Sequence, residues 1–576
     1  MLMFSPFKKR HVTSWPILLI IYNLPPELRF LLENVLCLGE IRGPKKPKDW
    51  DSFIWPAAKE FLKLAQGVCA YDSLSKSLFS FHAYLLLIFG DMPAVAMMMR
   101  MLGHNAISPC RACHIIGVRI PNKPRVTTHY VPLDRRNHPS AQTTSGTMLV
   151  KYDPKNLPMR THDDFLARAR AIQAAPTHAE AKRLRKESGI HGIPLLSILP
   201  SISFPQSFPH DFMHLIFENL IPNLVSLWTG KYKDFPPDDD FVLTPTVWDA
   251  IAEAGVASRA TIPSAFGAPM PNLSSERSHM TAETWSFWAI YLAPILLRRR
   301  FLKDTYYQHF VALVKLIKLC LQYEYTDEDI KTIEDGFSEW VMEFERHYYQ
   351  YDPERLSCCT LTIHALLHIA HDIRTAGPVW AYWAFPMERY CGRLLRAITS
   401  RRSPWSNLDR WIEFNALLTH IIAVYDLQGW DKIDLEPKRR PQRDITSRES
   451  RDKRDASFVR YQKLTDKRAR NHRAQPEFVI KDYWGQLKNM FILQLDVSHA
   501  RILGLNEPRT LFLAEIKQCK PDGIDDLGNV YYKDLGATEV VDLNAIQCAV
   551  GRVEVRQRRW AIIDRSGPLA QAVFTD

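Results

Sequence analysis

The sequence has few cysteines, ten among 576 residues, and from its first residues, MLMFSPFKKR, we expect no secretory leader. Scattered cysteines without a leader argue against a disulfide framework and for a reducing compartment. No apolar run reaches the roughly 18 residues that a membrane span needs, because residues 81–102 are interrupted by Asp91 and Arg100. We therefore expect neither export nor membrane insertion. A pair of closely spaced cysteines in such a protein indicates either a metal site or a redox site.

The sequence also lacks an internal repeat and an excess of acidic residues. Its net charge is +11, and the surplus is concentrated between Lys438 and Arg473, where 14 Lys and Arg stand against five Asp and Glu. Such a run can contact phosphates and release their counterions, which makes DNA a natural partner. The alternative is a solvated linker, and this feature alone does not choose between the two.

The first 90 residues show a mixed pattern of strands and one helix. Residues 15–22, 30–41 and 81–89 predict strands, and the apolar spacing of residues 50–68 predicts a helix. Asp91 would follow the last of these strands, where open α/β sheets place their chemistry. The alternative is that Asp91 only caps a helix that begins at Pro93.

The rest of the chain changes character twice. Apolar residues three to four apart predict a large helical block over about residues 160–380, and a further helix carries Glu388. After the basic segment, short β-type runs separated by Gly, Asp and Pro predict a small β-rich domain over about residues 476–576.

The pair Cys110-Arg-Ala-Cys113 has the spacing of half a tetrahedral zinc site. Two more ligands must come from elsewhere, and three histidine pairs offer them: His210/His214, His364/His368 and His368/His371. Residues four apart share one face of a helix, so each pair could give two imidazoles to one metal. Packed or surface histidines are the alternative, and spacing alone does not choose between the pairs.

Carboxylates that could hold Mg²⁺ for phosphoryl chemistry are Asp91 and the helical Glu218, Glu283 and Glu388. Most helix glutamates are only solvated surface groups. The aromatic residues around Glu388, in GPVWAYWAFPMERY, could wall a site or stack on bases, but a core role is favoured.

Taken together, several runs resemble the CACTA-type (En/Spm-like) DNA transposases in their fungal form. These runs are YNLPPELRF, GPKKPKDWDSF, FGDMPAVAMMMRMLGHNAISPCRAC, HDFMHLIFENLIPNL, GPVWAYWAFPMERY and GATEVVDLNAIQCAVG. The resemblance covers nearly the whole chain. It implies an RNase H-like core with a mixed sheet of order βββαβ, a large helical insertion and a small C-terminal all-β domain.

On this basis we expect five segments. They are a first part of the core with the CxxC knuckle at 1–159, a mainly helical insertion at 160–380, late core helices with the glutamate at 381–435, a basic linker at 436–475 and a β-rich domain at 476–576.

The resemblance also implies roles for individual residues. In the related Transib-type transposases and the antigen-receptor recombinase, the second catalytic Asp precedes a CxxC and a His pair precedes the Glu. The corresponding residues here are Asp91 and Glu388 as Mg²⁺-binding catalytic carboxylates, and Cys110, Cys113, His364 and His368 as ligands of a structural zinc. The runner-up assignment uses His210 and His214 with Glu218.

One departure concerns the first catalytic Asp. Relatives show an Asp-Gly-Phe-x-Pro-Phe-Lys-like run at the first strand, but the equivalent residues here are Leu2 to Lys8, and no acid occurs before Glu27. We expect a chain truncated at its N-terminus, with impaired Mg-dependent cleavage and strand transfer at transposon ends. The alternative is a non-catalytic DNA-binding or architectural protein. Both place the protein in the nucleus on DNA, and a homo-oligomer is compatible with either.

Overall fold

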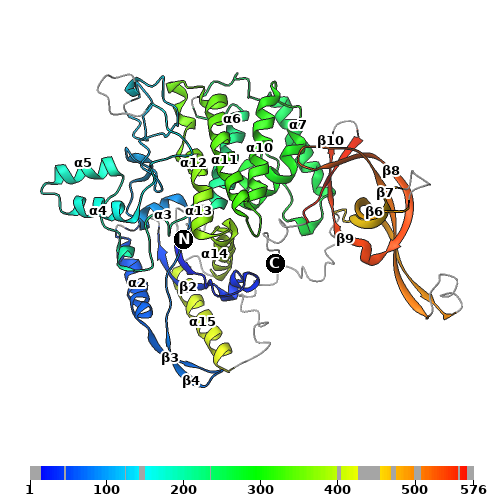
Figure 1. Ribbon diagram of the computed structural model, residues 1–576, viewed down its shortest axis with the longest axis horizontal. Helices are drawn as coiled ribbons and strands as arrows, with labels where there is room; N and C mark the ends of the chain where they lie inside the picture. Colours follow the sequence, from blue (N-terminus) through cyan, green and yellow to red (C-terminus); the bar gives the residue numbers. More distant parts are fainter. Residues whose placement is uncertain are drawn as a thin grey trace. The chain divides into compact units, whose positions relative to one another are not determined.

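The structure is a computed structural model (Figure 1). It describes residues 14–43, 47, 49–123, 125–141, 150–233, 235–398, 404–425, 454–468, 475–497, 507–555 and 558–566. It divides into two compact units, residues 1–220 with 324–445 and residues 221–323 with 446–576. The Leu2–Lys8 run and most of the basic segment 438–473 lie outside the described residues.

The first unit begins with the predicted pair of strands and the predicted helix. Strand β1 (Ser14–Leu19) pairs antiparallel with β2 (Leu36–Arg42), and the helix is α2 (Asp51–Gln66). Strand β2 starts later than predicted, because the short helix α1 (Pro26–Arg29) and a further helical turn precede it. The predictions of these three elements are otherwise confirmed.

The predicted strand over residues 81–89 is wrong. Only Phe81 belongs to a strand, as the last residue of β4 (Ser77–Phe81), which forms a hairpin with β3 (Val68–Asp72). Residues 82–90 have no regular structure, and the backbone of this run bonds to a loop instead: Ile88 N–H donates to the Ser207 carbonyl at 2.8 Å. The run is apolar enough for a strand, but among the described residues no strand pairs with it.

The described strands of the first unit therefore form two antiparallel pairs, β1–β2 and β3–β4. An RNase H-like mixed sheet stays a prediction. What the structure does give is an α/β unit in which β1, β2 and α2 share a core with α3 (Met92–Met98) and α4 (His162–Gln173). Phe165 of α4 stacks on Phe204 at a centroid distance of 5.0 Å.

The remaining helices of the first unit follow from capping and apolar spacing. Thr177 caps one of them and Thr326 forms a capping box with Asp329 at the start of another. These helices are α5 (His178–Ser188), α11 (Asp327–Phe344), α12 (Leu361–Ala365), α13 (Ile369–Ala376), α14 (Phe385–Ala397) and α15 (Pro404–Tyr425). A π-helical segment, Met213–Leu220, ends the first stretch of the unit.

The second unit combines helices with a C-terminal sheet. Its helices are α6 (Ile221–Trp228), α7 (Pro245–Ala257), α8 (Ala282–Phe287), α9 (Ala293–Leu296) and α10 (Asp304–Cys320). The exposed Glu283 lies in the first turn of α8.

The C-terminal sheet of the described residues is a curled, seven-stranded antiparallel sheet in the order β10-β11-β8-β7-β6-β5-β9 (Figure 1). The strands are β5 (Phe458–Asp466), β6 (Phe478–Leu495), β7 (Arg509–Ile524), β8 (Val530–Asp542), β9 (Ile546–Ala549), β10 (Gly551–Val555) and β11 (Arg559–Ile563). The predictions of a helical middle and a β-rich C-terminal part are confirmed, and the boundaries of the five segments stay predictions.

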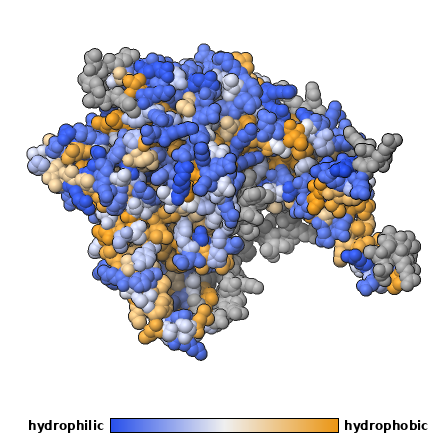
Figure 2. Space-filling model, in the orientation of Figure 1, coloured by the Kyte–Doolittle hydropathy of each residue, from blue (hydrophilic) through white to orange (hydrophobic). Residues whose placement is uncertain are grey.

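Apolar side chains gather on the surface around the β3–β4 hairpin and α2 (Figure 2). Leu78 and Phe79 of the hairpin and Trp55 of α2 are among the exposed large apolar residues. None of the described helices combines the length and the apolar character that crossing a membrane requires.

Candidate metal centre and acidic cluster

The Cys110–Cys113 loop is held by a buried arginine. Arg160 is 1% exposed, and its Nε donates to the carbonyls of Cys110 at 3.0 Å and Cys113 at 3.2 Å. Its Nη2 reaches the Ser108 hydroxyl and the Ser188 carbonyl, both at 2.9 Å. One guanidinium thus satisfies several buried acceptors and fixes the backbone that carries both thiols. Nothing in the sequence singled out Arg160 among 74 Lys and Arg.

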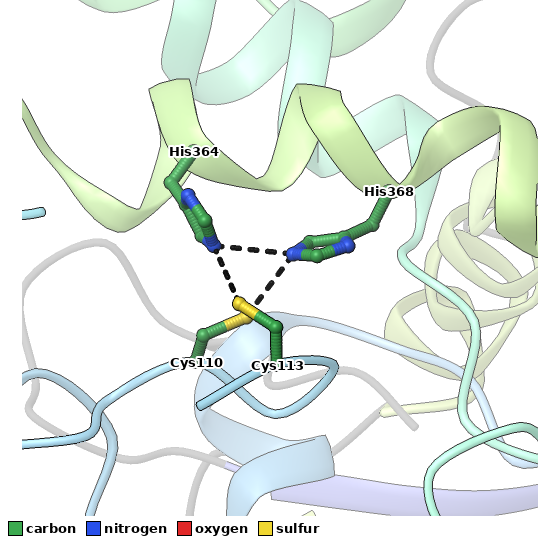
Figure 3. Close-up of side chains that lie close together, drawn as sticks. All are labelled: Cys110, Cys113, His364 and His368. Atoms are coloured by element: carbon green, nitrogen blue, oxygen red, sulfur yellow. Dashed lines mark hydrogen bonds between the residues drawn. The ribbon is translucent and has the colours of Figure 1, made fainter. Parts of the chain in front are cut away.

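His364 and His368 bring two imidazoles to these thiols from one helical stretch (Figure 3). His364 lies in α12, and His368 ends the single 3₁₀ turn that follows. Cys113 Sγ is 3.1 Å from His364 Nε2, Cys110 Sγ is 3.4 Å from His368 Nε2, and the two Nε2 atoms are 3.1 Å apart. The structure therefore brings together the four residues that the resemblance implies as zinc ligands, although about 250 positions separate the two halves.

Electrostatics at this cluster favour one ionised thiol. Burial opposes ionisation of Cys110, but a hydrogen bond with Cys113 and the imidazoles of His368 and His364 hold its pKa well below the usual value. Burial and the neighbouring Cys110 raise the pKa of Cys113. Burial lowers the pKa of His364, whereas the pKa of His368 is raised, because Cys110 and Asp372 outweigh its burial.

The donor set fits a structural zinc. Ligands of tetrahedral Zn²⁺ with bonds of about 2.0 to 2.3 Å lie about 3.5 Å from one another, close to the separations found here. All four side chains are buried, and His364 Nδ1 has no hydrogen-bond partner among the described residues. A Cys₂His₂ set leaves no open position, so the group it suits is structural.

The runner-up histidines lie beside this cluster without joining it. His210 donates from its ring Nδ1 to Asp372 at 2.7 Å, and its backbone N–H donates to the same carboxylate oxygen. The His210 ring stacks on that of His368 with a centroid distance of 5.8 Å. His210 therefore packs against a candidate zinc ligand, and Asp372 holds it there.

His214 belongs to a second cluster, together with Glu218 and Glu388. Its Nε2 lies 3.5 Å from Glu218 Oε2, and its Nδ1 is hydrogen-bonded to Asp211. Burial opposes protonation of His214, but Asp211 and the two glutamates raise its pKa to about 9. Burial, reinforced by Glu218, raises the pKa of Glu388 to about 7. This is the environment of a cation-binding or proton-transferring carboxylate.

Asp91 caps a helix, as its alternative interpretation held. Its Oδ1 accepts from the Ala94 N–H at 2.6 Å, with Pro93 in the first turn of α3. Asp91 also lines a cavity of about 570 Å³, whose wall includes Cys110, His210 and His214. No hydrogen bond or ion pair of the described residues joins Asp91 to Glu388, so their shared role stays a prediction.

The aromatic residues around Glu388 are core, as favoured. Trp380, Tyr382 and Trp383 are all buried, and Trp383 meets Phe385 edge to face at 5.0 Å. Because these side chains are buried, they cannot stack on bases. They pack in the core beside the start of α14.

Comparison with known families adds one finding. Residues 3–164 match the family model described as transposase family tnp2, and this range includes Asp91, both cysteines and Arg160. Comparison with curated proteins gave no match. The match to residues 3–164 supports a transposase family for this chain.

Proposed function

We propose that the protein acts on transposon DNA as a CACTA-type transposase of the fungal form. Its reaction class is strand cleavage at a transposon end followed by attack of the freed 3′-OH on target DNA. The observation that carries the proposal is the buried Cys₂His₂ cluster, because two of its ligands lie in the segment that matches the transposase family. Both steps are in-line phosphoryl displacements.

The cluster's role in this proposal is to hold distant segments together. His364 and His368 precede Glu388 by 24 and 20 residues, and Cys110 follows Asp91 by 19. Cys110, Cys113, His364 and His368 would hold a zinc ion, which would fix the helical stretch that leads into α14 against the loop that follows α3. Asp91 and Glu388 are the proposed carboxylate ligands of Mg²⁺. When bound, Mg²⁺ activates the attacking oxygen and stabilises the leaving one.

Catalysis is proposed to be weak in this chain. The run that resembles the family's first catalytic strand, Leu2 to Lys8, has no acidic residue, and we propose that the first of the family's three carboxylates is missing from it. This absence is also what favours the second candidate function, a DNA-binding protein that no longer cuts. In either case the ligand is DNA, the site of action is the nucleus, and the basic segment 438–473 contacts phosphates.

The experiment is a nicking and strand-transfer assay with the full chain, Mg²⁺ and plasmid DNA that carries the element's terminal inverted repeats. We expect duplex binding with slow nicking, which Asp91→Ala and Glu388→Ala abolish without loss of binding. Leu2→Asp, at the first position of this run, is expected to raise nicking by about 100-fold or more.

The control is Glu339→Gln, an exposed helix glutamate of the same unit, which should nick like the parent chain. Rapid cleavage by the unaltered chain would contradict the role given to the absent Asp. Binding without nicking, even in Leu2→Asp, would favour the second candidate. A chain that fails to bind duplex DNA at low salt would refute both.

A further inference from the structure

Two arginine-rich stretches of the second unit have no role in the proposed function. They are Arg298-Arg299-Arg300, just after α9, and Arg558-Arg559, where β11 begins. About 260 positions separate the two stretches along the chain. They meet at one cavity of about 680 Å³, whose lining includes the first three arginines and Arg559.

Hydrogen bonds between the helical part and the C-terminal sheet of this unit hold the walls of the cavity. Thr261, which lines the cavity, donates its hydroxyl to the Arg552 carbonyl at 2.6 Å, and its own carbonyl accepts from the Arg552 N–H at 3.1 Å. The Asp455 N–H donates to the Ala260 carbonyl at 2.8 Å, and the Asp455 carboxylate pairs with Arg552 at 2.7 Å. The cavity is therefore built by the fold of one unit.

The side chains at this cavity carry a surplus of positive charge. Four guanidiniums line it against a single carboxylate, that of Glu554. Arg559 also donates from Nε and Nη2 to Asp522, at 2.9 and 2.7 Å. Glu554 and Asp522 together balance two of the four charges, so the cavity favours an anion.

Arg299 and Arg558 have donors to offer. Both side chains are exposed, and within the described parts of the chain neither forms a hydrogen bond or an ion pair. Arg299 also borders a smaller cavity with Asp304, Asp525 and Asp526, but it pairs with none of them. Both arginines have a left-handed backbone, each with φ +58°. Residues other than glycine rarely adopt this conformation, and those that do cluster at functional sites.

The aromatic residues of the cavity already have cations over their rings. Tyr531 is 2% exposed, and the guanidinium carbons of Arg559 and Arg298 lie 4.6 and 5.6 Å from its ring centre. The guanidinium carbon of Arg552 lies 4.5 Å from the Trp560 ring centre. Base stacking needs an accessible ring face. These contacts favour a ligand that is recognised by its charge over one that is recognised by a stacked base.

The chemistry of the arginines suits phosphate groups. A guanidinium is a planar donor that binds phosphate through two parallel hydrogen bonds. Arginines from two separate stretches suit a ligand that carries several phosphates in a row, which a DNA strand provides. Contacts to phosphates fix a protein on DNA but carry no sequence information.

We infer that this cavity of the second unit binds the phosphate backbone of duplex DNA, independently of its sequence, through Arg299 and Arg558. It is a phosphate-binding site separate from the basic segment 438–473. The choice of DNA as the ligand rests on the proposed function, whereas the cavity and its charge rest on the fold.

The test is the binding of a labelled duplex of random sequence to the full chain without Mg²⁺, followed by fluorescence anisotropy. The double variant Arg299→Ala, Arg558→Ala should raise the Kd about tenfold or more, and lower the slope of log K against log salt by roughly 2, at about 0.9 per phosphate contact. Two duplexes of unrelated sequence should lose affinity equally, because the lost contacts are to phosphates.

The matched control is the double variant Lys488→Ala, Arg509→Ala. It removes the same charge from exposed side chains of β6 and β7 that do not line the cavity. It should bind DNA like the parent chain, and a thermal unfolding midpoint equal to the parent's shows that each variant has folded. An equal loss of affinity in both double variants would assign the effect to net charge and overturn the inference.

A second measurement locates the contact at the side chain. p-Hydroxyphenylglyoxal modifies accessible arginines, and peptide mass spectrometry gives the rate at Arg299, with the exposed Arg509 as internal reference. Duplex DNA should slow the modification of Arg299 about threefold or more, because a bound phosphate occupies the guanidinium. Inorganic tripolyphosphate and polyglutamate at equal total charge should protect it less. Equal protection by either would identify a small anion or an acidic protein as the ligand, and the inference would fall.

The inference and the proposed function fail separately. Duplex binding that the Arg299→Ala, Arg558→Ala variant leaves unchanged overturns the role of the cavity and leaves the proposed function standing. Protection of Arg299 by DNA in a chain that never nicks, even with Leu2→Asp, supports the cavity and refutes the proposed strand cleavage.

Discussion

Glu345 is a buried carboxyl whose partners are backbone groups. It is 3% exposed and accepts from the N–H groups of Leu133 and Asp134. Burial outweighs these two hydrogen bonds and raises its pKa from 4.5 to about 8. The folded protein therefore holds a proton on Glu345 at a pH where the unfolded chain has released it.

Between about pH 4.5 and pH 8, this residue makes the folded state lose stability as pH rises. The folded chain binds more protons than the unfolded chain in this window, so the free energy of unfolding falls with pH. The loss amounts to a few kcal/mol, on the order of 3 to 5. Glu345→Gln keeps an acceptor oxygen and cannot ionise, so its stability relative to the parent chain should improve as pH rises.

Urea unfolding at several pH values between 5 and 8.5 measures this difference. Arg135 and Asp134 also act on Glu345 and are unchanged in the variant. Parallel stability curves for the two proteins would show that Glu345 is ionised in the folded state.

At the scale of elements, the Cys/His cluster joins the loop after α3 to α12 across an interval of about 250 residues. Helix α12 is short and spans five residues, Leu361–Ala365. Short helices gain little from their own hydrogen bonds. The cluster is therefore a natural point at which a bound metal would stabilise the first unit.

We predict about one zinc per chain by elemental analysis, lost in Cys110→Ser. Because the ion binds the folded state, its loss should lower the free energy of unfolding by about 4 kcal/mol when free zinc is 1,000-fold above its Kd. A strong chelator should produce the same shift in the parent chain.

Cys69→Ser is the matched control, because this exposed cysteine lies in β3 and outside the cluster. It should keep its zinc and its stability. Full zinc retention in the double variant His364→Ala, His368→Ala would instead point to His210 and His214.

At the scale of the whole molecule, the net charge of +11 is the feature that bears on DNA. Much of the surplus lies in segment 438–473, which is outside the described residues except for 454–468. The proposed role of this segment in DNA binding depends on its charge. The salt dependence of the affinity for DNA therefore measures that role.

We predict that affinity for duplex DNA falls steeply with salt. Replacing Lys438, Arg439 and Arg440 by alanine should reduce the slope of log K against log salt by roughly 3, at about 0.9 per phosphate contact. Fluorescence anisotropy with a labelled duplex over a range of NaCl concentrations measures this slope.

The control changes the net charge equally by replacing three exposed helix lysines, Lys59, Lys315 and Lys331, by alanine. This variant should keep the parent slope. If both triple variants shift the slope alike, the effect belongs to net charge and not to the segment.

The sequence by itself determined the elements whose signal is local. Apolar spacing located α2, and the Asp91-Met-Pro93 order located the start of α3. The short β-type runs after residue 476 predicted a β-rich C-terminal part, and the structure forms it as an antiparallel sheet that also includes β5 (Phe458–Asp466). Such features depend on neighbours within a few positions, so periodicity and capping carry them. The prediction of a strand at 81–89 was wrong because a strand also needs a partner strand, and its own residues do not specify that partner.

Only the tertiary structure decided which distant side chains meet. Spacing left three histidine pairs open, and the fold placed His364 and His368 against Cys110 and Cys113. The fold placed His214 near Glu388 instead. Asp211 accepts hydrogen bonds from His214 and from the Ala384 N–H just before α14, and no motif had indicated this link. Contacts across hundreds of residues are set by how units pack, and packing depends on the whole chain. The sequence therefore shows which residues could bind a metal, but it does not show how they group into two donor sets.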